Sequence, residues 1–278
     1  MISSLNRYSN LTQRVIAAIV GAVLIGFGLY YSAWLFFFIF LAICIFTQLE
    51  FYKLVGLDGF IPLKTFGTFT GALLFSLTFF VESEQLDAKF YYLLFPISAC
   101  IYLIYLYQKK AVKPFRGIAF TFLGIVYVAI PFSLLNVIAF SQGDYEYILV
   151  LGSMLILWSS DTGAYFTGVR YGRRKLFERV SPKKSWEGSL GGFILAMGMA
   201  YSLSFFFVDV LPVWQWFWMG VIIVIGGTYG DLVESLFKRS IEIKDSGRSI
   251  PGHGGFMDRF DGLLLSAPFI AAFLKIFS

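Results

Sequence analysis

The chain has 278 residues, of which 58 % are hydrophobic and only 14 % are charged, and its formal net charge is +5. Because a soluble domain usually carries about a quarter charged residues, this composition excludes an ordinary soluble domain and predicts that much of the apolar surface faces lipid. Both cysteines, Cys44 and Cys100, lie within apolar runs, which favours small core side chains over a disulfide or a metal site. The polar N-terminal segment lacks a small-residue cleavage site, so we expect no cleaved signal peptide.

Apolar runs long enough to cross a bilayer recur along the whole chain. Each span needs about 20 predominantly apolar residues. We find no internal repeat and no low-complexity linker, and we therefore predict one all-α, polytopic integral membrane domain. Its nine candidate transmembrane helices run approximately over residues 14–31, 33–54, 66–82, 90–108, 117–141, 146–168, 189–210, 213–237 and 261–277.

The basic residues predict the orientation of these spans. With the N-terminus in the cytoplasm, every lysine and arginine except Lys89 and Lys275 falls in a cytoplasmic segment. An excess of positive charge on the cytoplasmic side is the rule for membrane proteins. The same distribution explains the basic net charge without a nucleic-acid partner, because the charge gathers where anionic lipid headgroups and nucleotides are found.

Acidic residues at membrane depth are the first candidates for a functional site. Asp161 follows the apolar run of the sixth span, and Asp231 follows that of the eighth. A carboxylate in an apolar span is costly, so it usually faces a polar cavity and has a function. Glu234, Ser235 and Lys238 lie three, four and seven residues after Asp231, so these four side chains share one helical face.

The segment SPKKSWEG, residues 181–188, lies just before the seventh span. Ser185 is a candidate N-cap of that helix, and the free N-terminus of a helix attracts an anion. Lys183 and Lys184 are therefore candidate contacts to a phosphate-bearing ligand. The alternative is that they anchor lipid headgroups at the membrane surface.

The stretch from Ser235 to Asp261, SLFKRSIEIKDSGRSIPGHGGFMDRFD, is polar although it lies between two spans, and we call it the signature segment. Arginine grips phosphate oxygens in pairs and lysine acts as a point charge, so its cations are typical of phosphate binding. For Lys238, Arg239 and Arg248 the alternative is an ordinary flanking charge. The segment holds four glycines, the only histidine, His253, five cations (Lys238, Arg239, Lys244, Arg248 and Arg259) and three aspartates (Asp245, Asp258 and Asp261).

Asp231, Asp258 and Asp261 predict a metal site. Several carboxylates that meet at one point repel each other unless a cation holds them, and hard oxygen ligands suit Mg²⁺. One or two ions, and an additional monovalent cation, are compatible with these residues. The alternative for Asp258 and Asp261 is that they are N-terminal helix acids favoured by the helix dipole. His253, between glycines, is a candidate for proton transfer or for a hydrogen bond to phosphate, against a purely structural role.

The signature segment resembles that of the phosphatidate cytidylyltransferases, also called CDP-diacylglycerol synthases. Two further segments look like motifs of that family: DTGAYFTG at residues 161–168, and SPKKSWEG, with Ser185 where threonine is more frequent. The resemblance is sharp over the carboxyl-terminal part of the chain and amounts to a general apolar pattern before it. Every fixed position of the family pattern is filled, by Ser235, Lys238, Arg239, Lys244, Asp245, Gly247, Pro251, His253, Gly254, Gly255, Asp258, Arg259 and Asp261.

The resemblance implies a magnesium-dependent nucleotidyltransferase of phospholipid biosynthesis, in which CTP and phosphatidate give CDP-diacylglycerol and pyrophosphate. Together with the residue chemistry, it leads us to expect catalytic roles for Asp231, Lys238, His253, Asp258 and Asp261. We expect substrate-binding roles for Asp161, Lys183, Lys184, Ser235, Arg239, Lys244, Asp245, Gly254, Gly255 and Arg259.

The topology and the motifs divide the chain into two parts. We expect residues 142–278 to carry the catalytic helices and cytoplasmic loops, and residues 1–141 to form a scaffold, a lipid groove or the contacts of a homodimer. The partners are then CTP, phosphatidate and membrane lipids, with no nucleic acid. The protein would lie in the cell (inner) membrane with its active site on the cytoplasmic side.

Two other classes of function compete with this one. A polyprenol or other lipid kinase would use similar groups to transfer a γ-phosphoryl group, although the P-loop pattern is absent. A CDP-alcohol phosphotransferase is another lipid-phosphate enzyme to consider, but its D-G-x-x-A-R motif is absent, which disfavours it. A transporter of anions or lipids would place charges near the midplane and often contains inverted repeats. Here the charges gather on one side, which disfavours transport.

Overall fold

The computed structural model describes residues 10–57, 59, 61–109, 113–243 and 255–277, and for residues 10–18 it describes the backbone alone. The short 3₁₀ helix η1 leads directly into α5, and the π-helical segment η2 joins α6 and α7 into one continuous helix. The elements are α2 (Asn10–Tyr31), α3 (Ala33–Leu57), α4 (Lys64–Glu82), η1 (Ala88–Leu93), α5 (Leu94–Tyr107), α6 (Pro114–Gly124), η2 (Ile125–Ala129), α7 (Ile130–Ala139), α8 (Tyr147–Tyr171), β1 (Lys175–Phe177), β2 (Ser181–Ser185), α9 (Trp186–Phe206), α10 (Val213–Ser240) and α11 (Met257–Phe277).

Apolar helices account for most of the described chain. Eight of its helices are long and apolar enough to cross a membrane, and α2 adds a shorter apolar stretch, Ile19–Tyr31. Large apolar side chains such as Phe95 and Leu106 are exposed, as expected of a surface that faces lipid. The prediction of an all-α, polytopic membrane protein is therefore confirmed, and each predicted span corresponds to one helical unit.

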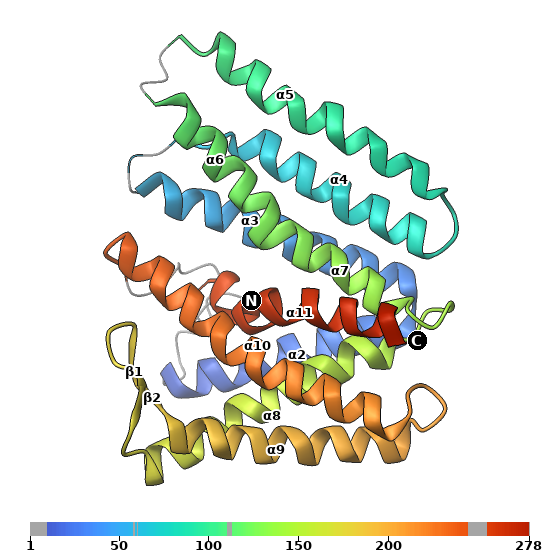
Figure 1. Ribbon diagram of the computed structural model, residues 1–278, viewed down its shortest axis with the longest axis vertical. Helices are drawn as coiled ribbons and strands as arrows, with labels where there is room; N and C mark the ends of the chain where they lie inside the picture. The colour runs from blue at the N-terminus through green and yellow to red at the C-terminus, as the bar shows by residue number, and fades with distance from the viewer. Residues whose placement is uncertain (1–9, 58, 60, 110–112, 244–254, 278) are drawn as a thin grey trace.

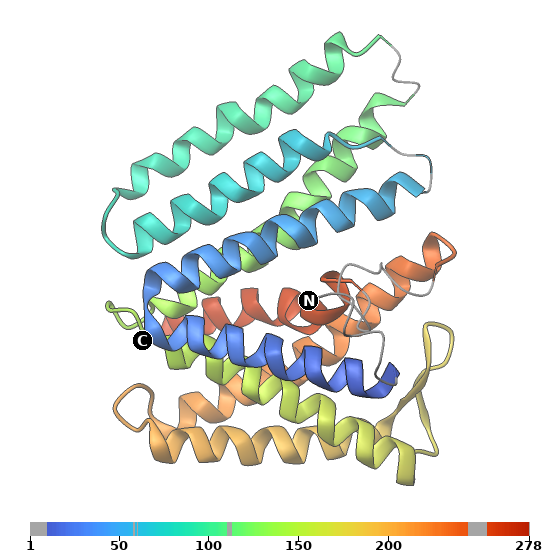
Figure 2. The same cartoon turned by 180° about the vertical axis from the view of Figure 1, so that it is seen from behind.

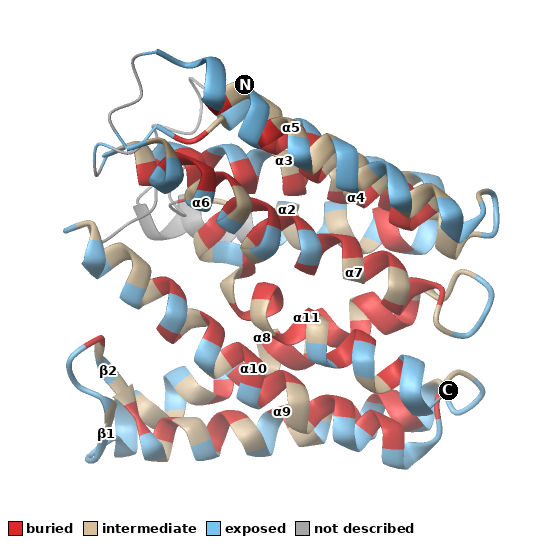
Figure 3. Ribbon diagram, turned by 45° about the horizontal axis from the view of Figure 1, so that its top comes forward, coloured by how far each residue is buried: buried red, intermediate tan, exposed pale blue. Residues whose placement is uncertain are grey.

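The helices lie side by side and run back and forth between two ends of the bundle (Figures 1 and 2). One end carries the β1–β2 hairpin and the carboxyl end of α10, and we call it the hairpin end. Helix α11 lies at the centre, where α10 packs on one side and α7 on the other. Buried residues gather where these helices face one another, whereas α5 at the edge of the bundle is largely exposed (Figure 3).

The hairpin departs from the all-helical prediction. Strands β1 and β2 pair antiparallel, with Lys175 opposite Ser185. The Ser185 Oγ accepts a hydrogen bond of 3.1 Å from the Gly188 N–H, so the predicted N-cap is confirmed and α9 begins at Trp186 rather than at residue 189. Helix α11 begins at Met257, four residues before the predicted start at residue 261. The prediction followed the apolar run, and the first turn of the helix is polar.

Glycines allow α8 and α9 to approach closely. A Cβ added at Gly163 would lie 2.6 Å from the carbonyl oxygen of Gly191 and 3.0 Å from the Cα of Gly192. Small residues at such contacts let the backbones of membrane helices approach closely. The resulting van der Waals packing drives helix association in lipid, where the hydrophobic effect does not. Asp161 lies two residues before Gly163, so the same contact also fixes the position of Asp161 relative to the hairpin that precedes α9.

We expect Gly163→Ala to destabilise the protein, because the new methyl group must push α8 away from backbone atoms of α9. Overpacking of this kind costs about 1–3 kcal/mol. Thermal unfolding of the purified protein in detergent measures the effect. Gly198→Ala is the matched control, since a Cβ at Gly198 meets nothing within 4 Å. Equal unfolding temperatures for the two variants would contradict the close α8–α9 contact.

Candidate functional site

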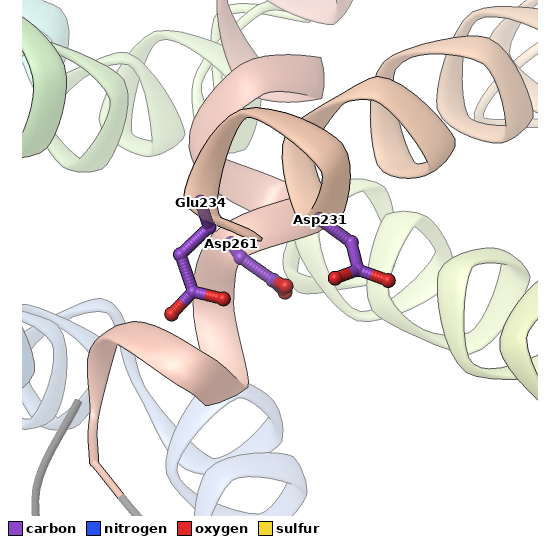
Figure 4. A group of neighbouring side chains, drawn as sticks. All are labelled: Asp231, Glu234 and Asp261. Carbon is purple, nitrogen blue, oxygen red and sulfur yellow. The ribbon is translucent and has the colours of Figure 1, made fainter. Parts of the chain in front are cut away.

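Three carboxylates meet where α10 crosses α11. Asp231 and Glu234 come from α10 and Asp261 from α11, and one ligand oxygen from each lies within 4.8 Å of the other two (Figure 4). The helices approach this closely because glycines line the crossing: a Cβ at Gly230 would lie 2.9 Å from the Cα of Gly262. We call Asp231, Glu234 and Asp261 the acidic cluster.

Two lysines flank the acidic cluster and neutralise part of its charge. The Lys238 Nζ lies 2.7 Å from the Glu234 Oε2 and 2.7 Å from the Asp258 Oδ1. The Lys184 Nζ, from β2, lies 2.6 Å from the Asp231 Oδ2 and donates a 3.2 Å hydrogen bond to the carbonyl oxygen of Thr228. The predicted helical face of Asp231, Glu234 and Lys238 is therefore present, and the hairpin adds a second cation to it.

The oxygen donors of the acidic cluster fit a metal ion. The Glu234 side chain is only 1 % exposed, and among the described residues its Oε1 has no hydrogen-bond partner. A buried carboxylate oxygen without a partner is costly, so such an atom usually faces a donor or a cation. Three carboxylates at one point are also the hard ligands that divalent cations such as Mg²⁺ prefer. The geometry thus supports a metal site built by Asp231, Glu234 and Asp261.

Asp258, which the sequence also predicts as a metal ligand, lies beside the acidic cluster and shares Lys238 with Glu234, and its role at a metal stays a prediction. Its Oδ1 pairs with Lys238, and its Oδ2 accepts a 3.0 Å hydrogen bond from the Gly255 N–H. The second contact is the bond of an N-terminal helix acid, the alternative that the sequence left open for this residue. A spacing of three places Asp258 and Asp261 on one side of α11 but does not fix where each carboxylate points.

Other predicted residues surround the acidic cluster. Asp161 on α8 is exposed, and the charges of Lys184, Asp231 and Arg259 act on its carboxylate. The Ser235 Oγ donates a 3.3 Å hydrogen bond to the Asp231 Oδ1, one helical turn away. These interactions show that predicted residues of α8, β2, α10 and α11 lie together at the hairpin end.

Some predicted residues lie apart from this group. Lys183 is exposed on β2, and the exposed Arg239 donates to the carbonyl oxygen of Ile243 just after α10. Four further predicted residues lie outside the described residues: Lys244, Asp245, His253 and Gly254.

Sequence reasoning missed two residues and underused a third. Glu234 was noticed on the helical face but not selected as a ligand. Glu50 on α3 accepts hydrogen bonds from the first backbone N–H groups of α11, and its signal was available, since it is the only acidic residue of that apolar span. Tyr127 lies in η2, and the charges of Glu234 and Asp261 act on its buried hydroxyl, which has no hydrogen-bond partner among the described residues. Nothing in the sequence pointed to Tyr127.

Comparison with known proteins gives one family. A family model described as "Cytidylyltransferase family" matches residues 12–277. The phosphatidate cytidylyltransferase of Bacillus subtilis (strain 168) is 34 % identical over 226 residues, which are 81 % of each chain. That of Staphylococcus haemolyticus (strain JCSC1435) is 38 % identical over 170 residues, covering 61 % of this chain and 64 % of the relative. That of Haemophilus influenzae (strain ATCC 51907 / DSM 11121 / KW20 / Rd) is 42 % identical over 129 residues, or 45 % of each chain.

The acidic cluster predicts binding of a divalent cation that Asp261→Asn abolishes. An ion that binds only the folded protein stabilises it by about 2.7 kcal/mol at 100 times its dissociation constant. We therefore expect Mg²⁺ to raise the unfolding temperature of the wild-type protein in detergent, and to have little effect on the variant. Asp209→Asn, an exposed carboxylate between α9 and α10, is the control and should respond like wild type. An unchanged response in Asp261→Asn would remove Asp261 from the ligand set.

Proposed function

The chain belongs to the cytidylyltransferase family, and on that premise we propose that it transfers the cytidylyl group of CTP to phosphatidate, giving CDP-diacylglycerol and pyrophosphate. The observation that carries the proposal is the acidic cluster with its two lysines, set at one end of a bundle of membrane helices. A lipid phosphate and a water-soluble triphosphate can meet only at such an end, with acyl chains in the bilayer and the nucleotide in water.

In the proposed reaction, a phosphate oxygen of phosphatidate forms a bond to the α-phosphorus of CTP. The bond from that phosphorus to the oxygen bridging it to the β-phosphate breaks, and pyrophosphate leaves. The attacking oxygen is already ionised, so catalysis of this kind consists mostly of positioning and charge stabilisation. A Mg²⁺ ion, held by Asp231, Glu234 and Asp261, would supply charge neutralisation to the triphosphate and the leaving group.

The two lysines have different tasks in this scheme. An ammonium group has three donors. Glu234 and Asp258 take two of those of Lys238, and we assign the third to a phosphate oxygen. Lys184 is more exposed, with 26 % of its side chain accessible against 13 % for Lys238. We therefore assign Lys184 to the triphosphate that arrives from water, where it can exchange Asp231 for a phosphate oxygen.

The remaining predicted residues complete the substrate site in this proposal. Their side chains or backbone N–H groups would hold the nucleotide and the phosphate of the lipid, and the helices of residues 1–141 would support the site. We assign this role to Asp161, Lys183, Ser235, Arg239, Gly255 and Arg259 among the described residues, and to Lys244, Asp245, His253 and Gly254 outside them.

The hairpin end would face the cytoplasm of a cell whose inner membrane holds the protein. Among the described residues, nearly all lysines and arginines belong to segments at that end, and cytoplasmic loops are the ones enriched in these residues. CTP would then be available on the side of the membrane at which the acidic cluster lies.

We expect the purified protein to release pyrophosphate only when CTP, phosphatidate and Mg²⁺ are all present. Leaving out each component in turn, in detergent, tests the three requirements separately. A nucleoside diphosphate as product would identify a lipid kinase instead. A folded sample that turns over no substrate would reopen transport.

Lys238→Ala should lower kcat about 100-fold, since the loss of one preorganised donor at a reacting phosphate costs this order of magnitude. Pyrophosphate release at saturating CTP measures the effect. Lys275→Ala is the control, because Lys275 is also ion-paired, to Glu82, but at the opposite end of α11. A Lys238→Ala enzyme with unchanged kcat and KM would make Lys238 a flanking charge.

A further inference from the structure

Helix α3 contacts both ends of the signature segment. The ring of Phe51 stacks on that of Phe237, next to Lys238 on α10, with centroids 5.3 Å apart. The ring of Phe46 stacks on that of Phe256, the residue before α11, with centroids 5.5 Å apart. An apolar helix of the amino-terminal half thus lies against the two points where the segment leaves α10 and enters α11.

Glu50 lies between these two aromatic contacts and binds the start of α11. Its Oε2 accepts a 3.1 Å hydrogen bond from the Phe256 N–H, and its Oε1 accepts a 3.1 Å hydrogen bond from the Met257 N–H. The residue is only 6 % exposed. The bonds join parts of the chain that lie 206 and 207 residues apart in sequence.

Elementary helix physics explains why a carboxylate stands there. The first backbone N–H groups of a helix have no partner inside the helix, and they carry partial positive charge. Bonds from such groups to a carboxylate are charge-assisted and stronger than neutral ones. Within a membrane, where an ionised side chain is costly, a buried glutamate at this place has a specific function by default.

Carboxylates bind the backbone N–H groups at the start of α11. Glu50 binds the N–H groups of Phe256 and Met257, and Asp258 binds that of Gly255. The first turn then carries Asp258 to Lys238, and the next residue on that side, Asp261, to the acidic cluster. A shift of this turn would therefore move both aspartates relative to α10.

We propose that Glu50 is a positioning residue, which fixes the amino-terminal turn of α11 and thereby the Asp258 and Asp261 carboxylates against Lys238 and Glu234. It touches no reacting atom in this scheme. The inference rests on the proposed function for its kinetic consequence, but its structural part concerns the acidic cluster alone. It also gives the amino-terminal half of the chain a role in the site.

Glu50→Gln is the sharpest test. The variant keeps the size of the side chain, but it loses the charge, and its amide NH₂ faces a backbone N–H that needs an acceptor. Misplacement of reacting groups by about 1 Å costs on the order of 100-fold in rate. We expect kcat for pyrophosphate release to fall between 10- and 100-fold with little change in the KM for CTP. Glu50→Asp, which restores the carboxylate, should recover part of the loss.

Glu82→Gln is the matched control. Glu82 on α4 is also a carboxylate of the amino-terminal half that binds α11, but it pairs with Lys275 at the far end, 2.9 Å away. We expect wild-type kcat for this variant. Equal kcat in Glu50→Gln and Glu82→Gln would overturn the proposal.

Two readouts separate positioning from general stability and do not need turnover. Hydrogen exchange should speed up in peptides spanning residues 255–262 of Glu50→Gln, and stay unchanged over residues 270–277. The Mg²⁺ concentration that gives half of the maximal increase in unfolding temperature should be at least several-fold higher for Glu50→Gln than for the wild-type protein. Faster exchange along the whole of α10 and α11, or an unchanged Mg²⁺ response, would overturn the proposal. If Glu50→Gln does not fold, the same measurements on Glu50→Asp decide it.

The outcomes also separate this inference from the proposed function. A wild-type protein that releases no pyrophosphate contradicts the cytidylyltransferase assignment, while the exchange and Mg²⁺ measurements still decide whether Glu50 positions α11. An active wild-type protein whose Glu50 variants match Glu82→Gln in all three measurements contradicts the inference alone.

Discussion

Mutual repulsion between Asp231, Glu234 and Asp261 is the constraint around which the hairpin end of the bundle is arranged. Three carboxylates within 4.8 Å, one of them almost fully buried, repel one another strongly when they are ionised, and nearby positive charge offsets that repulsion. The chain supplies that charge from separate elements, with Lys238 on α10 and Lys184 on β2. The hairpin is therefore tied to the helices by its lysine as well as by the Ser185 cap of α9.

Bringing the carboxylates together also requires helices that touch without intervening side chains. Gly230 and Gly262 give α10 and α11 this contact, and Gly163 gives it to α8 and α9. Close crossings fix the distance between helices but leave the first turn of α11 less constrained, because that turn precedes the crossing. Glu50 binds that turn, so the amino-terminal half of the chain positions a part of α11 that the glycine contacts do not reach.

The parts of the site that sequence could predict are those that depend on local spacing. Asp231, Ser235 and Lys238 share a face because a helix repeats every 3.6 residues, and the structure has that face. The helical units of the described chain follow from apolar runs in the same way. The bonds of Glu50 to α11 could not be predicted, because they depend on how helices far apart in sequence pack together. Tyr127 could not be predicted either, since the π-helical turn of η2 changes which face of the helix a residue occupies.

Charge balance connects the site to the substrates proposed for it. Four carboxylates meet two ammonium groups in the described structure, namely those of Asp231, Glu234, Asp258 and Asp261 against those of Lys184 and Lys238. When all four carboxylates are ionised, they exceed the ammonium groups by two negative charges, which equals the charge of one divalent cation. A triphosphate then brings several further negative charges, which need cations of their own. Lys183, Arg239 and Arg259 are exposed at the same end, and exposed charges lose little when they change partners. These exposed basic residues at the hairpin end suit an enzyme that receives CTP from water, because a metal site alone would give them no ligand.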